Sequence, residues 1–292
     1  MKVLVTGATG FVGRHLVPEI AGKHDVTSIV RRSSREADLG ASRVIEADLS
    51  DPTFIERLPH DVDVVVHLAQ AYLPFPDRAP DLFLVNAGST HWLAEYARRT
   101  GVTRFVLASS GSVYRPAREP LGENAATVPL TYHPATKLMS EMILAQYGPY
   151  FSSAILRLFA PYGRDQVDRL IPRMFDAIRA GMPITLSRGG EPRINPIHVD
   201  DLVSIVAQAI EDTRSYTVNV AGPQPASIRE LADAIGTLVG RAPVFADRDG
   251  DVPGDFVADT SLMRSLFTVG DLVPLERGLQ SVIASATAPP AH

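Results

Sequence analysis

The stretch that decides the fold is residues 2–13, Lys-Val-Leu-Val-Thr-Gly-Ala-Thr-Gly-Phe-Val-Gly, in which three glycines follow a short apolar run. The apolar residues 2–6 predict a buried parallel strand, and the amphipathic residues 11–21 predict the helix that follows it. The first glycine allows a tight turn, the second lets the backbone approach a pyrophosphate, and the third lets helix and strand pack closely. Because a helix start also offers free N–H groups to an anion, the stretch predicts a dinucleotide-binding turn with glycines at Gly7, Gly10 and Gly13.

The bulk properties narrow the class of protein. With 292 residues and 45% hydrophobic composition, the chain is long enough for one large α/β body and a smaller lobe. The net charge of -5 gives no basic footprint for nucleic acid or a membrane, so small molecules or other proteins are the expected partners. The absence of cysteine excludes disulfides and thiolate zinc sites, and no metal site is expected. No apolar run reaches the ~18 residues that span a bilayer and the start lacks a signal-peptide pattern, so a cytoplasmic protein is expected.

Strand-like apolar runs alternate with helical stretches through the first half of the chain. The runs are residues 25–30, 62–67, 104–109 and 154–159, and the helical stretches are residues 80–100 and 134–147. This alternation predicts an α/β fold with a doubly wound parallel sheet, the Rossmann arrangement, and a smaller C-terminal substrate lobe. The expected division is a dinucleotide-binding domain over residues 1–165, a smaller substrate-binding lobe over residues 166–285, and a frayed tail over residues 286–292.

Further short motifs extend the pattern beyond the glycine turn. They are residues 6–13, Asp48-Leu49, His67-Leu68-Ala69, Asn86, the run Ser-Ser-Gly-Ser-Val-Tyr at 109–114, Lys137, and His-Val-Asp-Asp at 198–201. With these motifs the chain resembles the extended short-chain dehydrogenase/reductase family, of the NAD(P)-dependent epimerase/dehydratase type, over nearly its whole length. The resemblance implies an oxidoreductase with a Rossmann fold and a nicotinamide dinucleotide cofactor.

The resemblance also implies which residues contact the cofactor. Asp48 and Leu49 border the adenine, with the Asp48 carboxylate accepting from the exocyclic amine, and Ala69 lines the cofactor at the carboxyl edge of the sheet. A surface aspartate that ends a strand is the alternative for Asp48, and His67 is expected to be a packed histidine. The implied cofactor-binding residues are Gly7, Thr9, Gly10, Phe11, Val12, Gly13, Asp48, Leu49, Leu68, Ala69, Asn86 and Lys137.

The residues after the second expected strand bear on the choice of cofactor. An acidic side chain there accepts from the ribose 2′-hydroxyl, whereas an arginine accommodates a 2′-phosphate. The chain has Arg31 and Arg32 at this place, followed by two serines. Because guanidinium groups bind phosphate in a fork, NADP is the expected cofactor. NAD is the alternative, in which case the two arginines are solvated surface residues.

The reaction chemistry that the resemblance implies uses a serine or threonine, a tyrosine and a lysine. The tyrosine exchanges a proton with the substrate oxygen, and the lysine binds the nicotinamide ribose and lowers the phenol's pKa from ~10. Ser110 matches the serine and Lys137 the lysine, but the position four residues before Lys137 is His133, with Tyr132 one residue earlier. Three alternatives stay open: His133 replaces the phenol as proton donor, Tyr132 shifts into the site, or catalysis is lost.

The residues that contact substrate in relatives are matched at one position and replaced at others. Arg193 matches an arginine that contacts the diphosphate in nucleotide-sugar enzymes of the family, with a surface arginine as the alternative. A second such arginine is replaced by Val252, and an expected sugar-contacting asparagine is replaced by Ala160. The acidic pair that dehydratases carry after the catalytic serine is Gly111-Ser112 here, so elimination is not expected.

The sequence therefore predicts an NADP-dependent oxidoreductase that transfers hydride at a carbinol or ketone carbon of a sugar or deoxysugar, with nucleotide-linked sugars among the candidates. A sugar epimerase with tightly bound cofactor is one alternative, and a non-catalytic dinucleotide-binding sensor or scaffold is the other. The resemblance implies a homodimer. The expected catalytic residues are Ser110, His133 or Tyr132, and Lys137, with Arg193 on the substrate.

Overall fold

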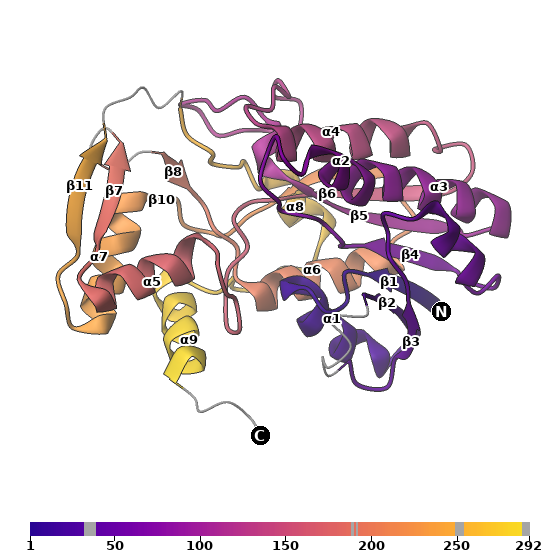
Figure 1. Cartoon of the computed structure of the whole chain (residues 1–292), viewed down its shortest axis with the longest axis horizontal. Helices are drawn as coiled ribbons and strands as arrows, with labels where there is room; N and C mark the ends of the chain where they lie inside the picture. Colours follow the sequence, from indigo (N-terminus) through magenta and orange to yellow (C-terminus); the bar gives the residue numbers. More distant parts are fainter. Residues whose placement is uncertain (32–38, 188–189, 191, 249–253, 288–292) are drawn as a thin grey trace. The chain divides into compact units, whose positions relative to one another are not determined.

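The computed structural model describes residues 1–31, 39–187, 190, 192–248 and 254–287, which divide into two units (Figure 1). Unit 1 comprises Met1–Arg115, Ala126–Arg157 and Val203–Val218, and unit 2 comprises Pro116–Ala125, Leu158–Leu202 and Asn219–His292. The expected single boundary at residue 165 differs from this division. The reason is that the chain returns to unit 1 with residues 203–218, which contain part of a strand of the main sheet.

Seven strands form the main sheet, in the order β3-β2-β1-β4-β5-β6-β9. They are β1 Lys2–Thr6, β2 Asp25–Val30, β3 Arg43–Glu46, β4 Val64–His67, β5 Arg104–Ser110, β6 Ser152–Leu158 and β9 Tyr216–Val220. β1 pairs in parallel with β2 on one side and with β4 on the other. The direction of winding therefore reverses between β1 and β4, which confirms the predicted doubly wound sheet. Ligands of such sheets bind outside the carboxyl ends of the strands at this reversal.

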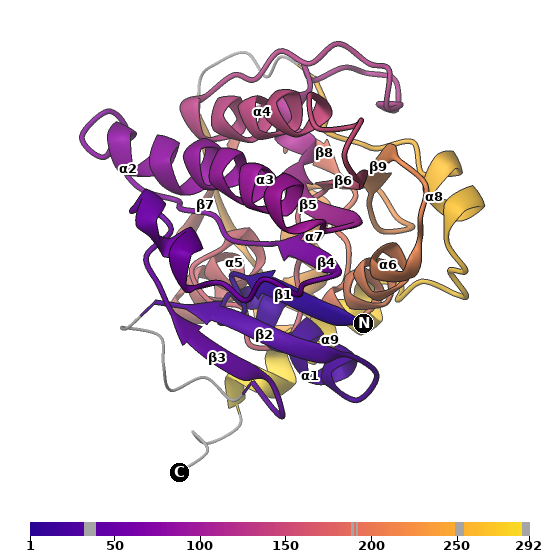
Figure 2. The ribbon, with the colours of Figure 1, turned by 90° about the vertical axis from the view of Figure 1, so that its right-hand side faces the viewer.

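Helices cover both faces of this sheet in unit 1. They are α1 Phe11–Ala21, η2 Pro52–Arg57, α2 Ala79–Phe83, η3 Leu84–Gly88, α3 Ser89–Thr100, η4 Gly111–Val113, α4 Tyr132–Ala145 and the larger part of α6 Val199–Glu211. α3 and α4 lie on one face, and α1 and α6 lie on the other (Figures 1 and 2). The predicted helical stretch at residues 80–100 is present as α2, η3 and α3, of which η3 is a π-helical turn.

The buried strands of unit 1 explain why its sequence reads as continuous apolar runs. Both β1 and β2 bury four or more consecutive residues, and their bounds match the predicted ones. Strands covered by helices on both faces have no solvent-facing side chains to alternate with. Leu4, Val65 and Phe105 from three strands, together with Leu93 of α3, belong to one hydrophobic cluster and are almost completely buried. This cluster fixes the strands whose carboxyl ends carry the candidate site.

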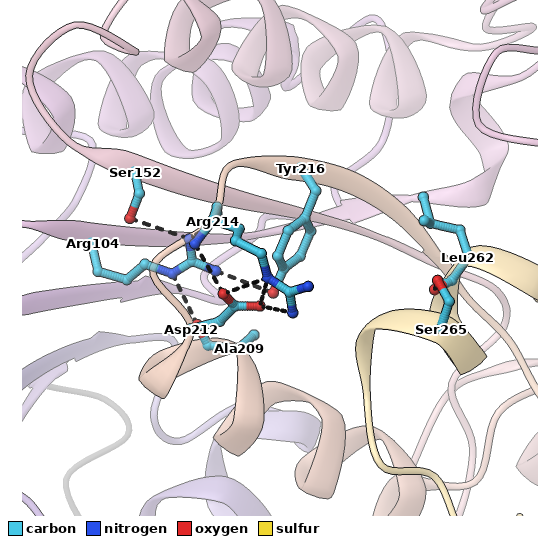
Figure 3. Close-up of polar contacts among 8 residues, drawn as sticks. All are labelled: Arg104, Ser152, Ala209, Asp212, Arg214, Tyr216, Leu262 and Ser265. Atoms are coloured by element: carbon cyan, nitrogen blue, oxygen red, sulfur yellow. Dashed lines mark hydrogen bonds and ion pairs between the residues drawn. The ribbon is translucent and has the colours of Figure 1, made fainter.

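The buried guanidinium of Arg104, at the start of β5, holds the end of α6 within unit 1 (Figure 3). Its Nε donates to the carbonyl of Ala209 at 2.9 Å, and its Nη2 donates to the hydroxyl of Tyr216 at 3.1 Å. Its Nη1 donates to the carbonyl of Arg214. A cation at this place satisfies carbonyls that a helix end leaves unpaired and interacts favourably with the helix dipole. This charged cluster stabilises the fold at the amino end of β5, the edge opposite the carboxyl ends.

Unit 2 has a hydrophobic core of its own. Its elements include α5 Leu170–Ala180, β7 Pro183–Ser187, β8 Arg193–Ile194, β10 Ala226–Ser227, α7 Ile228–Val239, β11 Val244–Arg248, α8 Ser261–Leu266 and α9 Leu275–Thr287. β7 and β11 pair in parallel, β8 and β10 pair antiparallel, and residues of α5, α7 and α9 form the core cluster. α9 includes residues 286 and 287 of the expected frayed tail, because Leu279 and Val282 anchor the helix in this core. Residues 288–292 lie outside the described residues.

Candidate functional site

The glycine turn after β1 is shaped so that side chains cannot enter it. Gly7 has a φ of 71°, and a Cβ on Gly7 would lie 2.6 Å from the backbone nitrogen of Ala69. A Cβ on Gly13 would lie 2.2 Å from the carbonyl oxygen of Gly7. Contacts this short are not possible, so both positions require glycine. Gly7 therefore brings the loop after β1 against the loop after β4, at the point where the winding of the sheet reverses.

The start of α1 offers its backbone N–H groups without competition from a side-chain cap. Gly10 is the N-cap residue, and no side chain forms a capping hydrogen bond there. The amide of Gly10 itself donates to the carbonyl of Gly7 at 2.9 Å, which closes the turn. Uncapped N–H groups and the helix dipole attract an anion. The turn therefore fits a dinucleotide pyrophosphate, with Thr9, Phe11 and Val12 partly exposed around it.

The other residues expected at the cofactor have different surroundings. Asp48 is exposed, and its Oδ1 accepts hydrogen bonds from the amide of Ser50 at 2.9 Å and from its hydroxyl at 2.8 Å. Leu49 is buried in the core cluster, so its side chain packs within unit 1. Arg31 is exposed directly after β2, whereas Arg32 lies outside the described residues.

Asn86 in the π-helical turn η3 uses its side chain on the protein. Its Oδ1 accepts from the amide of Ala71 at 2.7 Å, and its Nδ2 donates to the hydroxyl of Thr136 at 2.9 Å and to the carbonyl of Ala71 at 3.3 Å. Asn86 is completely buried. These bonds connect the loop after β4 to the first turns of α4, so the structure places Asn86 as a brace between two walls of the site.

His67 at the end of β4 is a packed histidine, as predicted, with no exposed surface. The hydroxyl of Ser89 donates to the carbonyl of Val85 at 2.6 Å, so its oxygen accepts from His67 Nε2 at 3.0 Å. The hydroxyl of Thr6 then donates to Nδ1 at 2.6 Å. Complete burial, with the nearby charge of Lys137, lowers the pKa of His67 to about 3. His67 therefore stays uncharged and fixes the ends of β1 and β4.

The first two turns of α4 carry the residues expected to perform the chemistry. α4 begins at Tyr132 after the N-cap residue Thr131, so Tyr132 and His133 both lie in its regular first turn. His133 precedes Lys137 by one turn, and residues four apart share a helix face. Lys137 is 1% exposed, and burial lowers its pKa to about 8, although Glu141 acts in the opposite direction. The structure therefore brings a half-buried imidazole and a buried amine to the same face of α4.

Ser110, at the end of β5, caps the short helical turn that follows it. Its Oγ accepts from the amide of Ser112 at 3.1 Å. The preceding residue, Ser109, points to α4 instead and donates a hydrogen bond to the carboxylate of Glu141. The two serines therefore have different structural roles. Ser110 stabilises the turn at the carboxyl end of β5, and Ser109 connects β5 to α4, the helix that carries Lys137.

A buried ion pair lies beneath this site, and the sequence analysis missed it. The guanidinium of Arg157 donates to Glu141 through Nε at 3.1 Å and through Nη2 at 2.6 Å. Its Nη1 donates to the hydroxyl of Tyr114 at 2.6 Å, and the guanidinium lies 4.6 Å from the centre of that ring. The sequence does hold one signal for a buried Glu141. Glu141 follows Lys137 by four residues, which places both side chains on one face of the helix.

Tyr132 and His133 each contact a different aromatic ring. The Tyr132 ring stacks on Phe75, with centroids 4.8 Å apart and planes at 25°. The His133 ring instead contacts the ring of Tyr72 in an edge-type arrangement, with centroids 5.0 Å apart and planes at 64°. Tyr72 and Phe75 both belong to the loop between β4 and α2. Consecutive residues of α4 therefore contact different residues of one loop.

Arg193 lies in unit 2, on the short strand β8. Its Nη2 donates to the carbonyl of Pro225 at 3.2 Å and lies 3.8 Å from the carboxylate of Glu230. Its side chain remains about half exposed, at 48%. Ala160, which stands where an asparagine was expected, has a φ of 40°, and Val252 lies outside the described residues.

The part of the chain that the structure describes offers neither a metal site nor a membrane-spanning helix. No group of three or more histidine, aspartate or glutamate side chains there is arranged to hold a metal ion. Among the same residues, no helix combines the length and the apolar character needed to cross a membrane.

Comparison with known proteins identifies the family. The chain matches the family model for the NAD dependent epimerase/dehydratase family over residues 3–221. The UDP-glucose 4-epimerase of Azospirillum brasilense is 28% identical over 98% of this chain and 90% of its own. The dTDP-4-dehydro-6-deoxy-D-allose reductase of Streptomyces bikiniensis is 27% identical over 95% of this chain and 94% of its own. The structure of MoeE5 in complex with UDP-glucose and NAD is 29% identical, covers 98% of both chains and has a TM-score of 0.87. The chain therefore belongs to the NAD dependent epimerase/dehydratase family and is an enzyme of the extended short-chain dehydrogenase/reductase type that uses a nicotinamide dinucleotide.

Proposed function

We propose that the protein is an NADP-dependent oxidoreductase that reduces a ketone, or oxidises the matching carbinol, on a sugar or deoxysugar derivative. The observation that carries this proposal is the pairing of His133 with the buried Lys137 on one face of α4. The fold gains no stability from burying an amine whose pKa falls to about 8. Perturbed titratable groups at the ligand-binding edge of a sheet are typical of catalytic sites.

Each group has a separate role in the proposed reaction. The bound dinucleotide supplies or accepts the hydride. His133 donates a proton to the substrate oxygen during reduction and takes it back during oxidation. Lys137 binds the nicotinamide ribose, and its positive charge favours release of the proton from the imidazolium. Ser110 binds the same substrate oxygen from the end of β5, while the glycine turn holds the pyrophosphate.

The helix geometry supports His133 over Tyr132 as the proton donor. Tyr132 precedes Lys137 by five residues, a spacing that puts the two side chains on different helix faces. Its ring also stacks on Phe75. Movement of Tyr132 into the site would break this stack and unwind the first turn of α4. His133 needs no such rearrangement, because the observed helix already gives it the spacing that a tyrosine has in the family pattern.

The preference for NADP rests on Arg31. It is exposed directly after β2, where a carboxylate would accept from the ribose 2′-hydroxyl. A guanidinium at this place suits a 2′-phosphate. NAD is the alternative, since MoeE5, a similar structure, is in complex with NAD. Comparing the affinities for the two dinucleotides separates these alternatives.

The relatives support a nucleotide-linked sugar as the substrate, and Arg193 is the proposed contact for its diphosphate. The named relatives act on UDP-glucose and on a dTDP-linked deoxysugar. Arg193 has a half-exposed guanidinium on β8. We expect Arg193→Ala to raise KM for such a substrate at least fivefold, with unchanged dinucleotide affinity, because a contact remote from the reacting carbon contributes uniform binding. An unchanged KM in steady-state assays would remove Arg193 from the substrate site.

The cytoplasmic location and the homodimer also belong to this proposal. The cytoplasmic location derives from the lack of cysteine and of a signal-peptide pattern. The homodimer derives from the resemblance of the sequence to its family. Light scattering after size-exclusion chromatography would give twice the chain mass of 31.5 kDa for a homodimer. A mass equal to one chain would contradict that part of the proposal.

The function is tested directly by incubating the purified protein with NADPH and a panel of dTDP- and UDP-linked 4-ketosugars. We expect oxidation of NADPH at 340 nm together with one equivalent of the hydroxy sugar, detected by mass spectrometry. Interconversion of UDP-glucose and UDP-galactose without net oxidation would favour the epimerase alternative instead. Tight NADPH binding without turnover of any sugar would contradict both catalytic assignments.

A further inference from the structure

The loop between β4 and α2 presents two aromatic side chains that the proposed chemistry does not use. Tyr72 is 68% exposed and Phe75 is 61% exposed, although both rings are large and apolar. Each contacts one residue in the first turn of α4, as described above: Tyr72 meets His133 and Phe75 meets Tyr132. Neither aromatic residue contributes much to the core, so their contacts with α4 need another explanation.

A chain of hydrogen bonds fixes this loop against α4. The amide of Ala71, next to Tyr72, donates to Asn86 at 2.7 Å, and Asn86 donates to the hydroxyl of Thr136 at 2.9 Å. That hydroxyl donates in turn to the carbonyl of His133 at 2.7 Å. The backbones on which Tyr72 and His133 stand are thus joined through two buried side chains. The backbone segments that carry the two rings are therefore held together within unit 1.

The imidazole of His133 needs such support more than a phenol would. It is shorter than a tyrosine side chain, and general acids act only within hydrogen-bond reach of the proton acceptor. Small errors in the position of a reacting group cost large factors in rate. An aromatic edge against the ring face is a favourable arrangement with a defined angle. The ring of Tyr72 thus limits the rotation of His133 about its side-chain bonds.

We propose that Tyr72 is a positioning residue whose ring orients the imidazole of His133 toward the substrate oxygen. This rests on the proposed function, in which His133 is the proton donor. The contact that carries the assignment is between the two rings, at 5.0 Å. Phenylalanine preserves such a contact, whereas leucine removes its quadrupole and its planar edge. The proposal therefore distinguishes the two substitutions.

The kinetic test compares Tyr72→Phe, Tyr72→Leu and the matched control Phe75→Leu, with NADPH and a ketosugar that the wild type reduces. Tyr72→Phe should retain kcat within about twofold, whereas Tyr72→Leu should lose roughly tenfold to a hundredfold, as expected for a misplaced reacting group. KM for NADPH should stay the same in all three variants. Phe75→Leu removes an aromatic ring from the same loop without touching His133, and should resemble the wild type. Equal losses in Tyr72→Phe and Tyr72→Leu would overturn the proposal, because the hydroxyl would then be the active part.

A second measurement does not depend on turnover. In carbon–proton correlation spectra of the protein saturated with NADPH, the ring signal of His133 is assigned by its loss in His133→Phe. In Tyr72→Phe the phenylalanine ring current should keep this signal at its wild-type position. In Tyr72→Leu the ring current is lost, so the signal should shift. An undisplaced signal in Tyr72→Leu would overturn the positioning role. If the wild type reduces no ketosugar, the proposed function fails, and the spectra still decide whether Tyr72 orients His133.

Discussion

The carboxylate of Glu141 and the guanidinium of Arg157 form a buried pair in unit 1, with Arg157 Nη2 at 2.6 Å from Glu141 Oε2. The two residues are only 6% and 7% exposed. Glu141 lies one turn after Lys137 on α4 and also accepts from Ser109, so one carboxylate joins β5, β6 and α4. The pair therefore supports the helix that carries the candidate proton donor.

Glu141→Gln should lower the free energy of unfolding by about 3 to 5 kcal/mol, because it leaves the guanidinium of Arg157 buried without a counter-charge. Urea unfolding with the slope held common to both proteins measures this difference. The matched control is Asp81→Asn, which removes a carboxylate from the exposed pair with Arg78. It should cost less than about 1 kcal/mol. Equal losses of unfolding free energy in the two variants would contradict this prediction, because the buried pair would then contribute no more to stability than the exposed one.

The stability of the protein should depend on pH through Lys137. Burial lowers its pKa in the folded protein from near 10.5 to about 8. Between these values the unfolded chain binds more protons than the folded one, so the free energy of unfolding rises with pH over this window. Below pH 8 both states are protonated and the contribution is constant. Subtracting the same profile for Lys137→Met, which lacks the titrating group, isolates the effect; a flat or falling difference from pH 8 to 10.5 would contradict it.

Arg31→Asp should weaken the binding of NADPH roughly tenfold or more, because a charge-assisted contact to phosphate contributes about 1.5 to 3 kcal/mol. The affinity for NADH should fall less or rise. Isothermal titration with both dinucleotides gives the ratio. The control is Arg43→Asp, an exposed arginine at the amino end of β3 and thus at the other edge of the sheet. Equal affinities for NADPH and NADH that neither substitution alters would leave Arg31 as a surface residue.

The sequence predicts the sheet well because its information is local. The glycines at 7, 10 and 13 and the run at residues 2–6 specify a strand, a turn and a helix, and the structure has them at the predicted residues. The division into units was not predictable in the same way, because strand order depends on long-range pairing. Strand β9 joins the sheet after the chain has passed through unit 2, and nothing in its five residues indicates this.

The contacts around the candidate site were likewise predictable only where they are local in the sequence. The spacing of His133 and Lys137 is readable from the sequence, because helix geometry relates residues four apart. The brace through Asn86 and the ring of Tyr72 connect segments 15 and 61 residues apart in the chain, counting from Ala71 to Asn86 and from Tyr72 to His133. Only tertiary structure brings such residues together.

The most direct test of the central claim is a comparison of kcat for His133→Phe and Tyr132→Phe, with NADPH and a ketosugar that the wild type reduces. His133→Phe should lower kcat by the ~10² to 10⁴ typical of losing a general acid, while NADPH affinity stays the same. Tyr132→Phe should stay within about twofold of the wild type, because its ring still stacks on Phe75 and its hydroxyl has no part in the reaction. A large loss in Tyr132→Phe, with His133→Phe close to the wild type, would contradict the assignment of His133 as the proton donor.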